Sequence, residues 1–302
     1  MTRRLTVAIA TYRRPERLAR AIGEVADALG ELADVDGEIL VVDNDPDGSA
    51  APVARAVRYV LEPEPGLSAA RNRALDEAAG ADLLVFIDDD ERPTPGWLPA
   101  LLRVLDECGA DAVAGRVVTA LPTPIDPWLT AVGAFVRPTR IDRQVMPQAA
   151  TNNLLLRMAA VRASGVRFDP RFGTTGGEDS LFTLQFSRSG YVIRWAQDAV
   201  VVEDVLPQRV DRHWILMRAY RNGTTSARLA AVLATGRAGR IRARAASIAG
   251  GLLRVAAGGA RWLLGVLFRS LRWRSTGTRA MYRGAGFVAG ALGRGYEEYA
   301  RR

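Results

Sequence analysis

The strongest constraint on the fold is an alternation of apolar strands and helical segments in the first two hundred residues. Strand-like runs occur at 5–10, 38–43, 58–62 and 82–88, and helical patterns occur at about 15–29 and 68–79. The runs are apolar along most of their length rather than at every second position, which is typical of parallel strands buried on both faces. The sequence therefore predicts an α/β fold with a mostly parallel sheet flanked by helices.

Polar side chains follow three of these strands at the point where each one ends. Thr11 and Tyr12 follow the first strand, Asp43 ends the second, and an aspartate triplet at 88–90 ends the fourth. Sheets of this kind bind ligands beyond the carboxyl ends of their strands. Three adjacent carboxylates repel one another unless a hard cation such as Mg²⁺ or Mn²⁺ neutralises them. The alternative is a solvated acidic turn that binds no metal.

Five segments carry a resemblance to a known family. They are TYRR (11–14), VVDN (41–44), PGLSAARNRAL (65–75), VFIDDDERP (85–93) and GGEDSLF (176–182). In this order they resemble the inverting glycosyltransferases of family 2, and the resemblance covers about residues 4–230. It implies the GT-A fold, which is a Rossmann-like sheet that binds a nucleotide-sugar donor, and it implies Mg²⁺ or Mn²⁺ as the cofactor.

The resemblance also implies roles on the donor side. Asp43 would hydrogen-bond the nucleotide base, although aspartate is also favoured as a cap of turns. Arg71 would meet the base or the pyrophosphate, and the alternative is an ordinary surface arginine. We expect Thr11, Tyr12 and Arg14 to close the other side of the donor.

By the same resemblance, Asp88 and Asp90 are the metal-binding carboxylates, and Asp88 would also contact the ribose. Asp89 is expected to face away along the turn. Many family members add a histidine ligand further along the chain, where this sequence has Glu203, so we predict Glu203 as the third metal ligand. The single histidine, His213, is more simply explained as a structural residue, because metal sites need several converging groups.

On the acceptor side, the resemblance makes Asp179 the base that deprotonates the acceptor hydroxyl. Glu178 would then position the acceptor. The alternative is that both carboxylates lie in the first turn of a helix because the helix dipole favours them there. Asn153 and Trp214 are also predicted on the acceptor side, although asparagine is common in turns as well.

Charge divides the chain into two regions. Residues 1–205 carry 22 Arg and 30 Asp or Glu, a net charge of −8, whereas residues 206–302 carry 19 Arg and three acidic residues, a net charge of +16. We predict a catalytic domain at 1–230 and an arginine-rich amphipathic helical region at 231–302. The apolar stretches of that region are far shorter than the ~20 residues needed to cross a bilayer, and its pattern suits an anionic membrane surface. The alternative is that its apolar face packs on the catalytic domain.

The composition also bears on compartment and partners. The apolar run at 5–10 is too short for a signal peptide, so we expect a cytoplasmic protein on the inner face of the cell membrane. One cysteine, Cys108, and one histidine rule out a disulfide framework and a Cys/His zinc site. We expect no nucleic-acid partner, because the arginine-rich region lacks a recognised nucleic-acid-binding motif.

These observations predict a metal-dependent inverting glycosyltransferase that moves a sugar from a nucleotide-sugar donor to an acceptor hydroxyl. A lipid-linked glycan precursor is the expected acceptor, as in exopolysaccharide or cell-envelope assembly. A sugar-1-phosphate nucleotidyltransferase is one alternative, but it would favour an early glycine-rich phosphate loop, and residues 5–38 carry none. The other alternative is a non-catalytic nucleotide-sugar-binding module on a membrane scaffold.

Overall fold

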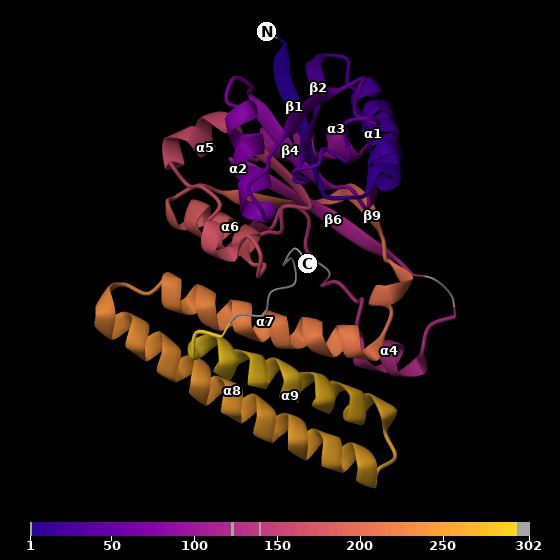
Figure 1. Ribbon diagram of the computed structural model, residues 1–302. Coiled ribbons are helices and arrows are strands. Elements are labelled where there is room, and N and C mark those ends of the chain that lie inside the picture. Colours follow the sequence, from indigo (N-terminus) through magenta and orange to yellow (C-terminus); the bar gives the residue numbers. More distant parts are fainter. Residues whose placement is uncertain (1, 122–123, 139, 295–302) are drawn as a thin grey trace. The chain divides into compact units, whose positions relative to one another are not determined.

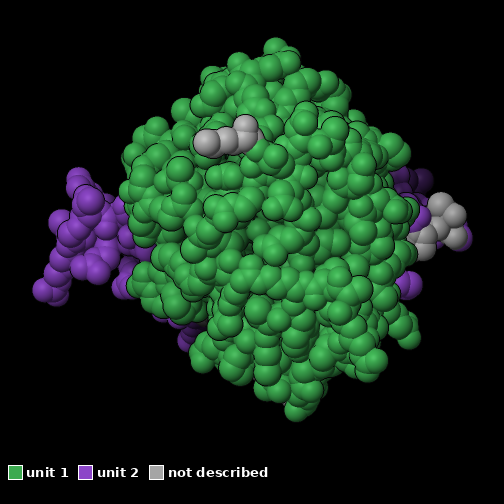
Figure 2. Space-filling model, turned by 90° about the horizontal axis from the view of Figure 1, so that it is seen from above, with its two compact units in different colours: residues 1–120, 137–204, 301–302 green, residues 121–136, 205–300 purple. Residues whose placement is uncertain are grey.

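The chain folds into two compact units. A computed structural model describes residues 2–121, 124–138 and 140–294 (Figure 1). Within these residues, the first unit comprises 2–120 and 137–204, and the second comprises 121–136 and 205–294 (Figure 2). The predicted domain boundary at residue 230 lies inside helix α7 (Arg212–Val232). The compact units meet at residues 120/121, 136/137 and 204/205, whereas the predicted domains meet at 230/231.

The first unit is built on one sheet, as the alternating pattern predicted. Its strand order among the described residues is β3-β2-β1-β4-β8-β6-β9-β5, and β7 pairs with β9. Strands β1 to β4 are parallel to one another, β6 is parallel to β9, and β8 runs antiparallel between β4 and β6. The strands are β1 (Arg3–Thr11), β2 (Val35–Asp43), β3 (Arg58–Leu61), β4 (Leu83–Asp88), β5 (Glu91–Pro93), β6 (Ala112–Ala120), β7 (Val145–Met146), β8 (Asn153–Arg157) and β9 (Ile193–Asp204).

Helices cover both faces of this sheet (Figure 1). The helices are α1 (Pro15–Gly30) and α3 (Trp97–Glu107) on one face, and α2 (Leu67–Glu77), α5 (Met158–Ser164) and α6 (Glu178–Arg188) on the other, with a short 3₁₀ helix at Pro170–Phe172. Successive strand residues point to opposite faces. In β4, for example, Val85 and Ile87 join the core under α1 and α3, whereas Leu84 and Phe86 join the core under α2 and α6. Burial on both faces explains why the strands are continuously apolar.

The second unit is helical. It contains α4 (Pro127–Val132), a 3₁₀ helix at Pro207–Arg209, α7 (Arg212–Val232), α8 (Gly236–Leu267) and α9 (Leu271–Ala291). Helix α9 runs alongside both α7 and α8 (Figure 1). None of the helices in the described ranges combines the length and the apolar character that a membrane span needs.

Glycines set the spacing of these helices. A Cβ atom added to Gly258 of α8 would lie 2.8 Å from the carbonyl oxygen of Gly277 in α9, and one added to Gly251 would lie 2.7 Å from that of Gly284. On the other side of α9, a Cβ on Gly286 would lie 2.0 Å from the carbonyl oxygen of Tyr220 in α7. Both helix pairs therefore approach through backbone atoms, which only glycine permits at these positions.

Candidate active site

The carboxyl ends of β1, β2 and β4 lie at one edge of the sheet. Thr11 is paired in register with Asp43, and Ala10 with Asp88. The polar residues that follow these strands therefore share a small region of the first unit, where ligands of parallel sheets bind.

Asp88 is the most accessible carboxylate of the aspartate triplet. Its side chain is 42% exposed, and its Oδ1 lies 3.6 Å from Nη2 of Arg71. The pKa of Asp88 is raised to about 6, first by loss of solvation among the surrounding protein atoms, with further contributions from Asp90, Asp89 and Glu203, while Arg71 lowers it. The carboxylates of this edge therefore lie close enough to one another for their charges to interact, which makes a cation favourable there.

Asp89 does not face away, and this expectation was wrong. Its side chain is buried and accepts hydrogen bonds from Oγ1 of Thr11, at 2.8 Å, and from Nη1 of Arg14, at 3.0 Å. A buried charge needs such partners. Asp89 therefore fixes two of the residues that we predicted to border the donor.

Asp90 is also buried and lies between two arginines. Its Oδ2 is 3.5 Å from Nη1 of Arg14 and 3.7 Å from Nη1 of Arg17. Sequence reasoning missed Arg17, although it follows Arg14 by three residues and so lies on the same face of α1. This edge of the sheet therefore carries basic side chains as well as acidic ones.

Glu91 was missed as well. Its carboxyl group is buried and accepts a hydrogen bond from the backbone N–H of Asp88, at 3.2 Å, and one from the side-chain amide of Asn152, at 2.5 Å. Burial and the nearby Asp88 raise the pKa of Glu91 well above its usual value. In the register of the antiparallel strands β5 and β9, Glu91 lies opposite Glu203. Its position directly after the triplet was the available signal.

Arg71 connects β4 with the start of α6. It is buried, forms an ion pair with Glu178, and lies over the ring of Phe168 at 6.0 Å. Its burial is inconsistent with an ordinary surface arginine. Glu178 is 3% exposed, and its Oε2 atom has no hydrogen-bond partner among the described residues. Burial raises the pKa of Glu178 to about 7, and Arg71 opposes this effect.

Asp179 begins α6 together with Glu178. Two glycines precede the pair, and both adopt left-handed backbone angles, with φ of 77° at Gly176 and 96° at Gly177. Glycine adopts these angles at little cost, which allows the chain to turn sharply into the helix. Asp179 is half-buried, and its Oδ1 accepts a hydrogen bond from the N–H of Ser180 at 2.6 Å. Its predicted role as base stays a prediction.

Asp43 has a structural role at the end of β2. It has no exposed surface, and it accepts hydrogen bonds from the N–H groups of Asp45 and Ala50 and from the hydroxyl of Tyr59. This is the turn cap that was the alternative to a base contact. Burial and Asp43 together raise the pKa of Tyr59 to about 12.

The next residue, Asn44, holds the loop that leads to α2. Its amide donates to the carbonyl oxygens of Glu62 and Glu64, and its side-chain oxygen accepts from the N–H of Gly66. Sequence reasoning did not single out Asn44, because its partners lie about twenty residues away.

Asn153 lies in the interior of the sheet. Its side-chain oxygen accepts from Nε1 of Trp97, at 2.8 Å, and its amide donates to the carbonyl oxygens of Arg116 and Ala199. It therefore joins β8 to β6 and β9, and its place on the acceptor side stays a prediction. Trp214 belongs to α7 in the second unit.

The remaining predicted residues have the following surroundings. Tyr12 is half-buried, with the Arg13 guanidinium over its ring at 5.3 Å. Glu203, at the end of β9, forms an ion pair with Arg137. His213 is exposed in α7.

A divalent cation fits the donor atoms of this edge. Within the described ranges, no three His, Cys, Asp or Glu side chains converge as a complete metal site. Mg²⁺ usually binds through one or two carboxylates together with the phosphates of its substrate, so a complete protein cage is not required. Asp88 and Asp90 supply hard oxygen ligands of this kind.

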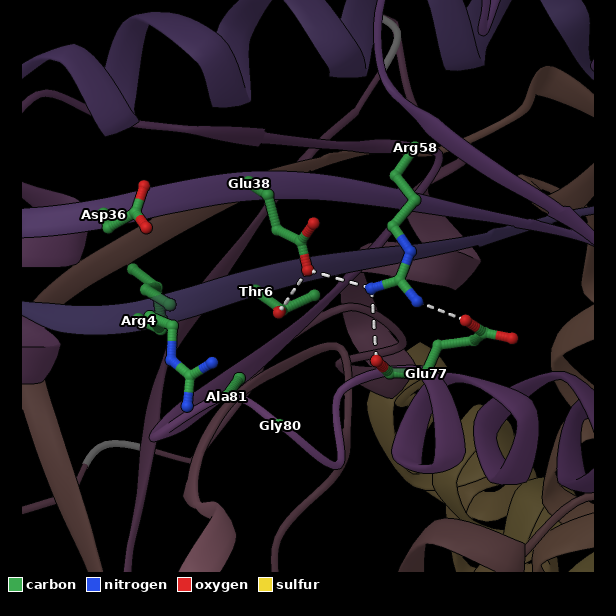
Figure 3. A pocket seen from close by; sticks show the side chains of 9 residues that line it. Arg4, Thr6, Asp36, Glu38, Arg58, Glu77, Gly80 and Ala81 are labelled. Atoms are coloured by element: carbon green, nitrogen blue, oxygen red, sulfur yellow. Dashed lines mark hydrogen bonds and ion pairs between the residues drawn. The ribbon is translucent and has the colours of Figure 1, made fainter.

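A polar pocket, separate from this edge, lies toward the amino ends of the strands (Figure 3). It has a volume of about 280 Å³ and is lined by Arg4, Leu5, Thr6, Asp36, Glu38, Arg58, Glu77, Gly80 and Ala81. Arg58 donates to Glu38 and pairs with Glu77, and Thr6 also donates to Glu38. Much of its charge is therefore neutralised internally.

The fold and the polar edge define a GT-A glycosyltransferase. Residues 6–163 match the family described as Glycosyl transferase family 2. The chain is also 32% identical over 244 residues to the succinoglycan biosynthesis protein ExoM of Rhizobium meliloti (strain 1021), and the match covers 78% of each chain. The chain therefore belongs to Glycosyl transferase family 2, which confirms the predicted family.

A more distant relative is the pre-mycofactocin glycosyltransferase of Mycobacterium tuberculosis, at 27% identity over 165 residues. That match covers 53% of this chain and only 34% of the relative.

Two solved structures share the fold at low sequence identity. S. aureus TarS 1–349 in complex with UDP has a TM-score of 0.53 at 14% identity, and the match covers 97% of this chain and 93% of that chain. GalNAc-T7 with UDP, GalNAc and Mn²⁺ has a TM-score of 0.55 at 13% identity, and the match covers 74% of this chain and 51% of that chain. These likenesses confirm the predicted GT-A fold.

Proposed function

We propose that this glycosyltransferase moves a sugar from a nucleoside diphosphate to an acceptor hydroxyl, with inversion at the anomeric carbon and with the help of a divalent cation. One observation carries the proposal. Arg71 lies between Asp88, at the end of β4, and Glu178, which adjoins Asp179 at the start of α6. A group suited to bind diphosphate and a candidate base therefore belong to the same small region.

The donor would lie beyond the ends of β1, β2 and β4. Arg71 and Arg14 are suited to the diphosphate, because guanidinium groups bind phosphate oxygens in a bidentate manner. Thr11 and Tyr12 would border the nucleotide, and Asp43 would support the loop after β2 on the side of the base. The solved structures of TarS and GalNAc-T7 contain UDP, which makes a uridine nucleotide the first donor to test.

Asp88 and Asp90 would hold the cation, with Glu203 near them. When bound, the cation would stabilise the negative charge that develops on the leaving diphosphate. Mn²⁺ accompanies UDP in the GalNAc-T7 structure, which supports a test with this ion. Asp89 would keep Thr11 and Arg14 in place beside the donor.

Asp179 would act as the base in a single displacement. The acceptor oxygen forms a bond to the anomeric carbon while the bond from that carbon to the diphosphate oxygen breaks. The bonding electrons leave with the diphosphate, and the acceptor proton passes to a carboxylate oxygen of Asp179. Attack from the face opposite the leaving group gives inversion. Glu178 would keep Arg71 oriented and position the acceptor.

The acceptor would be a lipid-linked glycan precursor. The relative ExoM is named for succinoglycan biosynthesis, which supports a role in exopolysaccharide assembly. The arginine-rich helical region, residues 231–302, would keep the enzyme at the cytoplasmic face of the membrane, where such an acceptor lies.

The test is release of nucleoside diphosphate by the wild-type chain and by Asp179→Asn, with Mn²⁺ and with EDTA. Loss of a general base lowers kcat by about 100- to 10,000-fold, so we expect a fall of this size in Asp179→Asn while donor binding is kept. Asp198→Asn, at an exposed aspartate that pairs with Arg103, is the matched control and should keep its activity. Undiminished turnover in Asp179→Asn would contradict the assignment. Donor binding without any turnover in the wild type would support a non-catalytic module.

A further inference from the structure

The glycine contacts between α8 and α9 determine which face of α8 points outward. Gly251, Gly258 and Gly265 follow one another at seven-residue intervals, so they lie along one side of the helix, and this side packs against α9. Because the glycines are used in helix packing, the large apolar residues of α8 lie on the side that α9 does not cover.

This outward side exposes large apolar side chains in the second half of the helix and at its C-cap. They include Leu252, Leu253, Leu263, Leu264, Leu267 and Phe268, whose exposed fractions range from 44% to 72%. We refer to these six residues as the apolar face of α8. Patches of this kind on a protein surface mark sites of interaction.

The apolar face has basic residues around it. Arg254 and Arg261 lie at its edge, and Arg269 and Arg272 follow in the turn to α9 and in its first residues; all four are exposed. Between residues 212 and 294 the sequence contains sixteen arginines and no aspartate or glutamate. A surface that is apolar in the middle and basic around it is complementary to an anionic lipid leaflet.

Two other occupants fit less well. A second copy of the chain would bring two strongly basic helical units together, and their like charges would repel. The first unit has few apolar side chains to offer, because only three of the 17 large apolar side chains exposed in the described residues belong to it, namely Leu61, Ile141 and Val145.

We propose that the apolar face of α8 enters the acyl-chain boundary of an anionic membrane, with the flanking arginines at the lipid headgroups. Because α9 packs on α8 through glycines, the two helices would enter as one hairpin, with Phe268 and Trp273 of its turn packed edge to face, 5.9 Å between ring centroids. Membrane binding itself does not depend on the proposed function. Only its purpose rests on that function, namely to bring the active site to a lipid-linked acceptor.

The experiment is flotation of the full chain with phosphatidylcholine vesicles that contain or lack phosphatidylglycerol. We expect binding only to the vesicles with phosphatidylglycerol. The double variant Leu263→Glu/Leu267→Glu places two charges on the apolar face and should bind at least about 10-fold more weakly, because it removes apolar burial and adds repulsion. Leu61→Glu, at an exposed leucine of the first unit, is the matched control and should bind like the wild type.

A second variant, Arg261→Gln, tests the electrostatic part and should weaken binding about 5-fold. Circular dichroism of every variant should show unchanged helix content.

Equal flotation of wild type and double variant, or no flotation of the wild type, would overturn the proposal. So would a lipid-free wild-type dimer that the double variant converts to monomer, because this would assign the face to a second copy. Diphosphate release with a water-soluble acceptor does not require vesicles, so failure of the proposed chemistry would be seen separately.

Discussion

Asp43 shows at the level of one residue that a motif position can suit two roles and that its partners can come from another part of the chain. The sequence places an aspartate at the end of β2, and both a base contact and a turn cap suit it there. The structure shows the cap, with Tyr59 as one of three hydrogen-bond donors. One of these donors, Tyr59, belongs to β3, a neighbouring strand that pairs with β2. Local sequence does not contain that information.

The Tyr59 hydroxyl gives a pH-dependent prediction. The pKa of Tyr59 rises from 10.0 to about 12 in the folded chain, because of burial and the nearby Asp43. A raised pKa contributes stability that is complete below pH 10 and is lost as the pH rises through about 12. Tyr59→Phe should lower the free energy of unfolding by about 1–2 kcal/mol at neutral pH, the usual range for such a hydrogen bond.

Urea unfolding of both proteins from neutral pH to pH 12 checks this prediction. The sequence contains no lysine, so the other six tyrosines are the main groups that titrate between about pH 10 and 12, and both proteins share them. The wild-type advantage should shrink across this interval. A constant difference at every pH would show that the hydroxyl does not bond Asp43 in solution.

The active-site residues differ in how far sequence could identify them. Asp88 and Asp90 stand out because three carboxylates follow an apolar strand. The burial of Asp89 could not be predicted, because it depends on partners from other elements, whereas Arg17 and Glu91 were signalled only by their closeness in sequence to Arg14 and to the aspartate triplet. Thr11 and Arg14, for example, reach Asp89 from the end of β1 and the start of α1.

At the level of elements, α8 has two neighbouring glycines at which substitution by alanine should change stability in opposite directions. A Cβ on Gly258 would lie 2.8 Å from a backbone oxygen of α9, whereas a Cβ on Gly259 would find its nearest atom at 3.9 Å. Gly258→Ala should therefore destabilise the helical unit by about 1–3 kcal/mol through overpacking. Gly259→Ala should stabilise it by about 0.5–1 kcal/mol, because alanine favours the helix.

Thermal unfolding followed by circular dichroism compares the two variants. A lower midpoint for Gly258→Ala and an unchanged or higher midpoint for Gly259→Ala is the expected result. Equal midpoints would mean that α8 and α9 are not in close contact. The sequence predicted an amphipathic helical region here, but the pattern of one helix does not say what its small residues face, so the glycine contacts between α8 and α9 could not be predicted.

At the scale of the whole molecule, the chain combines an acidic catalytic unit with a basic helical one. The fold class was predictable because continuously apolar strands separated by helices admit few arrangements. The separation of charge was also visible in the sequence. The boundaries of the compact units were not, because the segment 121–136 belongs with α7 to α9 and not with the strands beside it in sequence.

The central claim is that Asp88 and Asp90 hold a cation that carries the diphosphate of the donor. Calorimetric titration of the full chain with UDP, with Mn²⁺ and with EDTA, tests it most directly, in the wild type, in Asp88→Asn and in the control Asp198→Asn. We expect Mn²⁺ to tighten UDP binding in the wild type and in the control, and to have no effect in Asp88→Asn. UDP binding that is the same with Mn²⁺ and with EDTA, or a Mn²⁺ effect that persists in Asp88→Asn, would contradict the claim.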